Sequence, residues 1–245
     1  MILDIDAGNS RVKWRLHSRQ GYIEQGSFSS TEFSEEAFQD IEKHLVKNVR
    51  LASVAAAELN AFLKSRVALL WGVGCSQVAT HNQGLVKVAY EDPSSLGVDR
   101  WLAMLAAYNA ANSPVLVVDC GTAMTLDVVD SAGMHLGGYI VPGLATMRRA
   151  LNLSTGHVRV ESNILSENMC LGRSTVDAVN SGILLETVSF VERVYQMSLE
   201  RCGGILEVYL TGGDATMISQ YLGVSFCLKP DLVLDGIPFA CIGES

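Results

Sequence analysis

The feature that most constrains the fold of this chain is a pattern of elements that occurs twice, once from residue 2 and again from residue 115. In each copy an apolar strand ends in Asp-x-Gly followed by Asn or Thr, as Asp6-Ala7-Gly8-Asn9 and as Asp119-Cys120-Gly121-Thr122. Each copy continues with a second strand, a turn, a third strand and a helical pattern. This agreement in order and spacing favours duplication of one structural unit over coincidence.

The first copy has the alternation that is typical of a half-buried strand. Residues 11–16 read R-V-K-W-R-L, with apolar and basic side chains in turn, and this period of two predicts a strand. With the strand over residues 2–5 and an extended stretch after Gly21, it predicts an antiparallel meander. Apolar residues between positions 33 and 45 recur at helical spacing, so a helix is expected there.

Each Asp-Gly loop has the chemistry of a phosphate site. A carboxylate such as Asp6 at a strand end can hold Mg²⁺ through water, and the small residues after it let backbone N–H groups approach phosphate oxygens. In the second loop, the Thr122 hydroxyl and its neighbouring amides suit a γ-phosphate. The charge of Asp119 beside a polyphosphate would require a cation between them. Either loop alone is also typical of a tight turn, whereas two together make a two-sided phosphate clamp.

Two further motifs bear on a ligand. In Leu96-Gly97-Val98-Asp99-Arg100, the carboxylate can accept a hydroxyl proton and the guanidinium can pair with a carboxylate substrate; a helix-capping Asp beside a surface Arg is the alternative. Thr211-Gly212-Gly213-Asp214 is a strand-to-helix turn whose glycines allow close approach of a base or ribose. Turns with two glycines are common, so this second motif is weak alone.

Composition excludes several classes of protein. The chain has 245 residues, of which 49% are hydrophobic, and a formal net charge of −8, so it is neither disordered throughout nor basic enough to bind nucleic acid. No apolar run approaches the roughly 18 residues that span a bilayer. The six cysteines form no C-x-x-C pair, which argues against zinc and for small core side chains in a reducing compartment. We therefore expect a soluble cytoplasmic protein.

In this order the motifs resemble those of the type III pantothenate kinases, a family in the superfamily of acetate and sugar kinases, actin and the 70-kDa heat-shock chaperones. The resemblance covers essentially the whole chain. It is carried by five stretches: D-A-G-N-S at 6–10, L-G-V-D-R at 96–100, D-C-G-T-A at 119–123, G-G-Y-I-V-P-G at 137–143 and T-G-G-D-A at 211–215.

The resemblance implies a fold and a reaction. The fold is α/β, with two duplicated ribonuclease H-like domains, 1–112 and 113–245, and a nucleotide cleft between them. The reaction is ATP-dependent phosphorylation of pantothenate to 4′-phosphopantothenate, the first step of coenzyme A biosynthesis. The implied cofactors are ATP with Mg²⁺ and a monovalent cation, K⁺ or NH₄⁺. The implied assembly is a homodimer in which the neighbouring subunit completes each pocket and residues 137–143 lie near the contact.

Carried over by position, the resemblance also assigns residues. ATP would be bound by Asp6, Ala7, Gly8, Asn9, Ser10, Arg11, Val12, Lys13, Thr122, Gly212 and Gly213. Pantothenate would be bound by Tyr90, Gly97, Val98, Asp99, Arg100 and, from the neighbouring subunit, Thr175. Asp99 would be the catalytic base, Asp119 the ligand of the monovalent cation, and Asp6 a water-mediated ligand of Mg²⁺.

Two other functions fit the same sequence. Because a fold does not determine a function, the chain could be a non-enzymatic ATP-binding regulator, and the family was also named after a proposed transcriptional accessory factor. A kinase of another small hydroxy acid is the second alternative. The Asp99-Arg100 pair favours an enzyme, since a protein that only binds ATP has no need of it.

Overall fold

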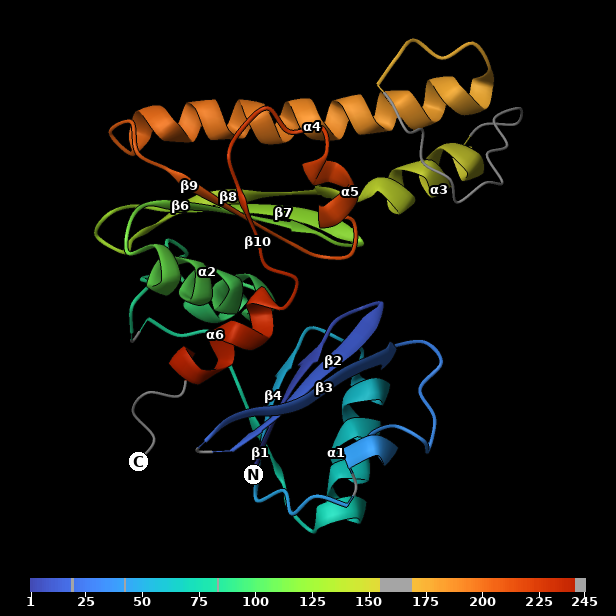
Figure 1. Cartoon of the computed structure of the whole chain (residues 1–245), viewed down its shortest axis with the longest axis vertical. Helices are drawn as coiled ribbons and strands as arrows, with labels where there is room; N and C mark the ends of the chain where they lie inside the picture. Colours follow the sequence, from blue (N-terminus) through green and yellow to red (C-terminus); the bar gives the residue numbers. More distant parts are fainter. Residues whose placement is uncertain (19, 42, 83, 155–168, 241–245) are drawn as a thin grey trace. The chain divides into compact units, whose positions relative to one another are not determined.

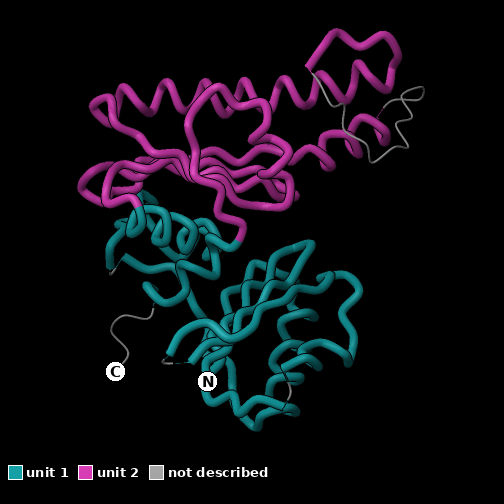
Figure 2. The backbone as a smooth tube through the Cα atoms, in the orientation of Figure 1, with its two compact units in different colours: residues 1–110, 231–245 teal, residues 111–230 magenta. Residues whose placement is uncertain are grey.

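The computed structural model describes residues 1–18, 20–41, 43–82, 84–154 and 169–240. It divides into two compact units, residues 1–110 with 231–240 and residues 111–230 (Figure 2). The sequence predicted two domains, 1–112 and 113–245. The structure instead groups the last described segment with the first unit, because its apolar residues and its carboxylates pack there. Among the described residues, no helix combines the length and apolar character needed to cross a bilayer.

Unit 1 is built on a five-stranded sheet with the order β3-β2-β1-β4-β5 (Figure 1). The first three strands form the predicted antiparallel meander, and the last two are parallel to β1. The strands are β1 Ile2–Ala7, β2 Arg11–Ser18, β3 Gly21–Ser29, β4 Asn48–Ser53 and β5 Cys75–Gln77. The helices are η1 Gln39–Ile41, α1 Ala57–Trp71, η2 Pro93–Ser95, α2 Val98–Ala111, which ends at the unit boundary, and α6 Leu232–Ala240.

The two faces of this sheet differ in character. Leu3, Ile5, Val12 and Trp14 lie on one face and form a core with α1. The alternate residues of β1, β2 and β4 form the other face, which carries Asp4, Asp6, Lys13, Arg15, His17 and Arg50. Helix α6 contacts β1 and β2. The period of two in the sequence therefore records one apolar and one charged face.

The helix expected over residues 33–45 is not present in the described part of that segment, so this prediction was wrong. The segment contains turns and the short η1. Phe38 has a φ of 69°, a left-handed conformation that no helix interior accommodates. Phe38 and Ile41 are nevertheless buried, so the apolar spacing reflected burial in the core and not helical geometry.

Unit 2 repeats the topology of unit 1. Its sheet has the order β10-β9-β6-β7-β8, with β6, β7 and β8 antiparallel and β9 and β10 parallel to β6. The strands are β6 Val115–Cys120, β7 Ala123–Val129, β8 His135–Pro142, β9 Glu207–Thr211 and β10 Cys227–Leu228, and the helices are α3 Leu144–Ser154, α4 Thr175–Arg201 and α5 Ala215–Ser219. Helix α4 lies along one face of the sheet (Figure 1) and shares its core. The duplication predicted from the sequence is confirmed.

Candidate active site

The two Asp-Gly loops occupy equivalent places in the two sheets. Asp6 is the next-to-last residue of β1, and Asp119 is the next-to-last residue of β6. In both sheets the Asp lies on the face that alternates with the core residues packed on α1 or α4. Both side chains are half-buried, so each central strand ends in an accessible carboxylate.

Two hydrogen bonds fix the first loop. The Gly8 amide donates to the Arg11 carbonyl oxygen at 3.1 Å, and Ser30 Oγ donates to the Gly8 carbonyl oxygen at 2.8 Å. Asn9 and Ser10 are exposed, as a loop that presents groups to phosphate requires. Ala7 and Val12, by contrast, have fully buried side chains, so only their backbone groups can face a ligand.

The second loop is fixed by Gly143, which follows β8, and by Thr146 of α3. The Thr122 carbonyl oxygen accepts the Gly143 amide at 3.0 Å and Thr146 Oγ1 at 2.7 Å. A side chain at Gly143 would overlap the Gly121 carbonyl oxygen, so this position needs glycine. Thr122 is exposed.

The predicted nucleoside turn lies against this second loop. The Asp214 amide donates to the Cys120 carbonyl oxygen at 3.0 Å. Gly212 has a φ of 93°, and a side chain there would overlap both Asp119 Oδ1 and the Cys120 backbone. The structure thus brings Gly212, Asp119 and the second loop together at one end of the unit 2 sheet.

Charge and burial control the ionisation of this region. Burial raises the pKa of the Cys120 thiol, and the charges of Asp119 and Asp214 raise it further, so the thiol stays protonated. Burial also raises the pKa of Asp214, opposed by the nearby Arg148. Cys120 is the one buried cysteine of the five that the structure describes, and Cys170 is exposed. Cys241 lies outside the described residues.

The predicted pantothenate motif surrounds the start of α2 in unit 1. Asp99 lies within the first turn of this helix, where the macrodipole favours an anion, and its Oδ1 accepts the Arg100 amide at 2.8 Å. Arg100 is buried, and its Nη1 donates to Tyr90 Oη at 3.1 Å. A side chain at Gly97 would lie 2.6 Å from Asp99 Oδ1, so glycine leaves room for the carboxylate.

Two other residues predicted to bind pantothenate are Val98 and Thr175. The Val98 side chain is buried in the core, so only its backbone can contribute. Thr175 is the exposed first residue of α4 in unit 2, next to the capping Ser174, whose Oγ accepts the Asp177 amide at 3.1 Å. Residues 155–168, which precede Thr175 in the chain, lie outside the described residues.

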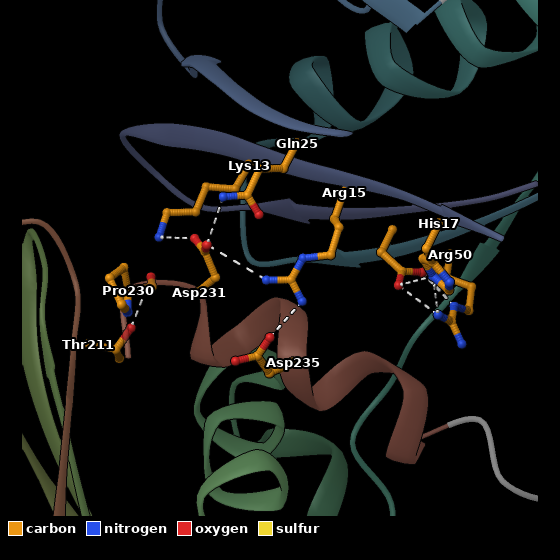
Figure 3. Close-up of polar contacts among 10 residues, drawn as sticks. Lys13, Arg15, His17, Gln25, Arg50, Thr211, Pro230, Asp231 and Asp235 are labelled. Carbon is orange, nitrogen blue, oxygen red and sulfur yellow. Dashed lines mark hydrogen bonds and ion pairs between the residues drawn. The ribbon is translucent and has the colours of Figure 1, made fainter. Parts of the chain in front are cut away.

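Sequence reasoning missed the carboxylates that face the basic strand. Lys13 Nζ lies 3.4 Å from Asp231 Oδ1, and Arg15 Nη1 lies 2.6 Å from Asp235 Oδ1 (Figure 3). Asp231 and Asp235 are one helical turn apart, a spacing that places both on one side of a helix. That spacing, beside a strand with Lys and Arg at alternate positions, was the available signal.

The side chains of this site suit cations that a bound phosphate and water would coordinate together with one or two carboxylates. In the described ranges, no three His, Cys, Asp or Glu side chains gather to hold a metal ion. Mg²⁺ in phosphate sites uses one or two carboxylates, with water and phosphate oxygens as its other ligands, and Asp6 fits that role. Asp119, whose carboxylate leaves no room for a side chain at Gly212, has oxygen atoms of the kind that a monovalent cation would need.

Comparison with known proteins identifies relatives over nearly the whole chain. The model of the type III pantothenate kinase family matches residues 2–197. A protein named type III pantothenate kinase from Chromohalobacter salexigens is 39% identical over 97% of this chain and 86% of its own length. One of the same name from Pseudomonas aeruginosa is 36% identical over 98% of this chain and 99% of its own.

Solved structures support the fold. A structure described as a conserved putative Baf family transcriptional activator from Campylobacter jejuni has a TM-score of 0.59 at 19% identity, covering 99% of this chain and 98% of its own. A putative 2-dehydro-3-deoxygalactonokinase protein from Sinorhizobium meliloti has a TM-score of 0.54 at 12% identity, covering 100% and 99%. At these identities the likeness concerns the fold alone, and it confirms the α/β class with duplicated domains.

Proposed function

This chain belongs to the type III pantothenate kinase family, whose reaction is the ATP-dependent phosphorylation of pantothenate in coenzyme A biosynthesis, and we propose the residues that perform this reaction here. The observation that carries the assignment is the arrangement at the start of α2. There a carboxylate and a buried, tyrosine-bonded guanidinium occupy adjacent positions.

Asp99 is the proposed base. Its carboxylate at a helix N-terminus would orient the primary hydroxyl of pantothenate and accept its proton as the phosphoryl group is transferred. Arg100, held by Tyr90, would pair with the carboxylate of pantothenate. Such pairing fixes the hydroxyl relative to Asp99, and positioning supplies much of the rate in phosphoryl transfer.

ATP is proposed to contact the first loop, the Thr122 loop and the glycines at 212 and 213. The exposed amides at Asn9 and Ser10 and the ammonium group of Lys13 suit its phosphates. Asp6 would hold Mg²⁺ through water, and that ion supplies neutralisation of the polyphosphate charge. Burial of Ala7 and Val12 limits these two residues to backbone contacts.

A monovalent cation at Asp119 is the next part of the proposal. In unit 1 the residue directly across the ladder from the loop Asp6 is the cation Lys13. In unit 2 the residue across from Asp119 is the neutral Thr125. Thr125 brings no positive charge to this ladder position, and K⁺ or NH₄⁺ bound to the Asp119 carboxylate, as the resemblance to the family implies, would offset the charge of a polyphosphate beside it.

The homodimer is proposed from the exposed edge of the unit 2 sheet. Strand β8 is an edge strand and exposes Leu136, Tyr139 and Ile140 by 40%, 46% and 61%. Unpaired edge strands with apolar side chains favour association. In such a dimer the exposed Thr175 of one subunit would reach the pantothenate site of the other.

The direct test is ADP release by the purified protein with and without pantothenate, in K⁺ buffer. Release that depends on pantothenate is expected. ATP binding without release would favour the regulator, and release only with another hydroxy acid would identify a different kinase.

A further inference from the structure

One carboxylate at the start of α6 gathers side chains from two strands of unit 1. Asp231 Oδ1 lies 3.4 Å from Lys13 Nζ, although the two residues are 218 positions apart in the chain (Figure 3). On the other oxygen, Oδ2, Gln25 Nε2 donates at 3.2 Å and Arg15 Nη2 lies at 3.7 Å. The Asp231 side chain is 26% exposed, so these contacts are only partly screened by water.

Packing of α6 determines where this carboxylate lies. The Asp231 carbonyl oxygen accepts the Asp235 amide at 2.9 Å, which starts the helix. Asp235 then binds Arg15 at 2.6 Å. At Gly236 a side chain would overlap the carbonyl oxygen of Leu102, so α6 fits closely against α2. Asp231 is therefore carried by a helix that is anchored to both α2 and β2.

The position of the Lys13 ammonium group depends on the groups that it contacts. A lysine ammonium is a compact charge on a flexible four-carbon chain, so its position is set by what it contacts. The ladder places Asp6 directly opposite Lys13, within reach of a cross-strand interaction. A second carboxylate on the α6 side, 3.4 Å from the ammonium nitrogen, attracts this group and so competes with Asp6 for it.

From these contacts we propose that Asp231 is a positioning residue: it holds the Lys13 ammonium group where the phosphates of ATP can bind it. The inference rests on the proposed function only in taking Lys13 as an ATP contact. It adds a residue of the C-terminal segment to the nucleotide site, and it assigns α6 a role beyond completing the core.

The test is a double-mutant cycle read by calorimetric titration with a Mg²⁺ complex of a non-hydrolysable ATP analogue. Asp231→Asn removes the charge but keeps a side chain suited to a helix start. Asp235→Asn is the matched control, since it removes a charge from the same helix opposite Arg15 and leaves Lys13 alone. The other variants are Lys13→Ala, Lys13→Ala with Asp231→Asn, and Asp231→Glu. Melting temperatures are measured for all of them.

We expect Asp231→Asn to raise the dissociation constant of the analogue about 3- to 10-fold, the scale of one hydrogen bond of ordinary net strength. In the Lys13→Ala background the same change should alter the constant by less than about 1.5-fold, because the two residues act as one unit. Asp231→Glu should retain much of the affinity that Asp231→Asn loses. In both variants the KM for pantothenate should not change.

Three results would overturn the proposal: an equal loss in the Lys13→Ala background, an equal loss in Asp235→Asn, or no loss in Asp231→Asn. No binding by the unaltered protein would also overturn it. The titration needs no turnover, so a protein that binds the analogue but lacks pantothenate-dependent ADP release would contradict the proposed function and leave this test readable.

Discussion

The two sheets share one strand order, yet they surround the loop aspartate differently. Unit 1 places Lys13 across from Asp6, and its remaining face carries further charges that pair with one another or with α6. Unit 2 places Thr125 across from Asp119, and its central strand β6 is almost entirely buried. The comparison indicates that unit 1 places a cation across from its loop aspartate, whereas unit 2 places a neutral side chain there, and the proposed monovalent cation would fill that difference.

The buried ion pairs of the two units also differ in the charge of the residue that faces the aspartate. In unit 1 the buried Asp4 binds Arg50 through Nε at 2.5 Å and Nη2 at 2.6 Å, with His17 Nε2 at 2.8 Å. In unit 2 the buried Asp127 contacts His135 Nε2 at 3.0 Å. An arginine is always charged, whereas a histidine can become neutral. The two units should therefore respond differently when the carboxylate is removed.

The largest expected effect concerns the base in unit 1. Asp99→Asn should preserve the fold and ATP binding and reduce kcat by about 10²–10⁴-fold, since the amide is nearly isosteric but cannot accept the proton. Steady-state kinetics with a parallel ATP-binding titration would check this. A near-normal rate would mean that Asp99 only stabilises the helix N-terminus.

The second prediction sharpens the contrast between the ion pairs. Asp4→Ala should lower the free energy of unfolding by about 3 kcal/mol, because it leaves the mostly buried Arg50 charge without its carboxylate. Asp127→Ala should cost less, about 1–2 kcal/mol, because His135 can remain neutral. Denaturant titrations of both variants measure the difference, and equal losses would contradict the argument from arginine.

The third prediction tests the monovalent cation proposed at Asp119 in unit 2. Replacing K⁺ with Na⁺ should lower activity about tenfold or more, because a site suited to the larger K⁺ would bind the smaller, more strongly hydrated Na⁺ poorly and so lose the charge that it places near the polyphosphate. Asp119→Ala should weaken the response to K⁺. Thr125→Lys, which copies the Asp6–Lys13 arrangement, should make activity less dependent on K⁺. Equal rates of the unaltered protein in both salts would remove this role from Asp119.

The smallest effect concerns the sheet edges, apolar at β8 and polar along much of β3. Asp99→Asn and a bulky substitution at Thr175 should each inactivate the enzyme. When the two proteins are mixed with free exchange, about half of the dimers are mixed and hold one intact site each. Activity should then recover to roughly a quarter of the unaltered level.

The control for this mixing experiment uses the two edges. Ile140→Lys on β8 should prevent recovery, while Tyr22→Lys on β3, an equally exposed position at 62%, should not. Exchange is followed by native mass spectrometry. If mixed dimers form and no activity returns, Thr175 does not act across the interface.

Much of the fold and the candidate site followed from local sequence. The alternation in β2 reported two different sheet faces, and the repeated Asp-Gly motif predicted a duplicated structural unit, because both signals depend on neighbouring residues. The contact between Tyr90 and Arg100 joined two parts of one predicted motif. Apolar spacing alone misled at residues 33–45, since burial of Phe38 and Ile41 required no helix.

Only the tertiary structure decided where the end of the chain belongs. The spacing of Asp231 and Asp235 indicates that two carboxylates share one side of a helix, but it does not say that residues 231–240 pack with residues 1–110, because their partners lie in β2 at the other end of the sequence. The close approach of Gly236 to Leu102 is likewise a contact between distant elements. Sequence periodicity reports which side of an element is buried, whereas ion pairs and glycine contacts between remote segments exist only once the chain has folded.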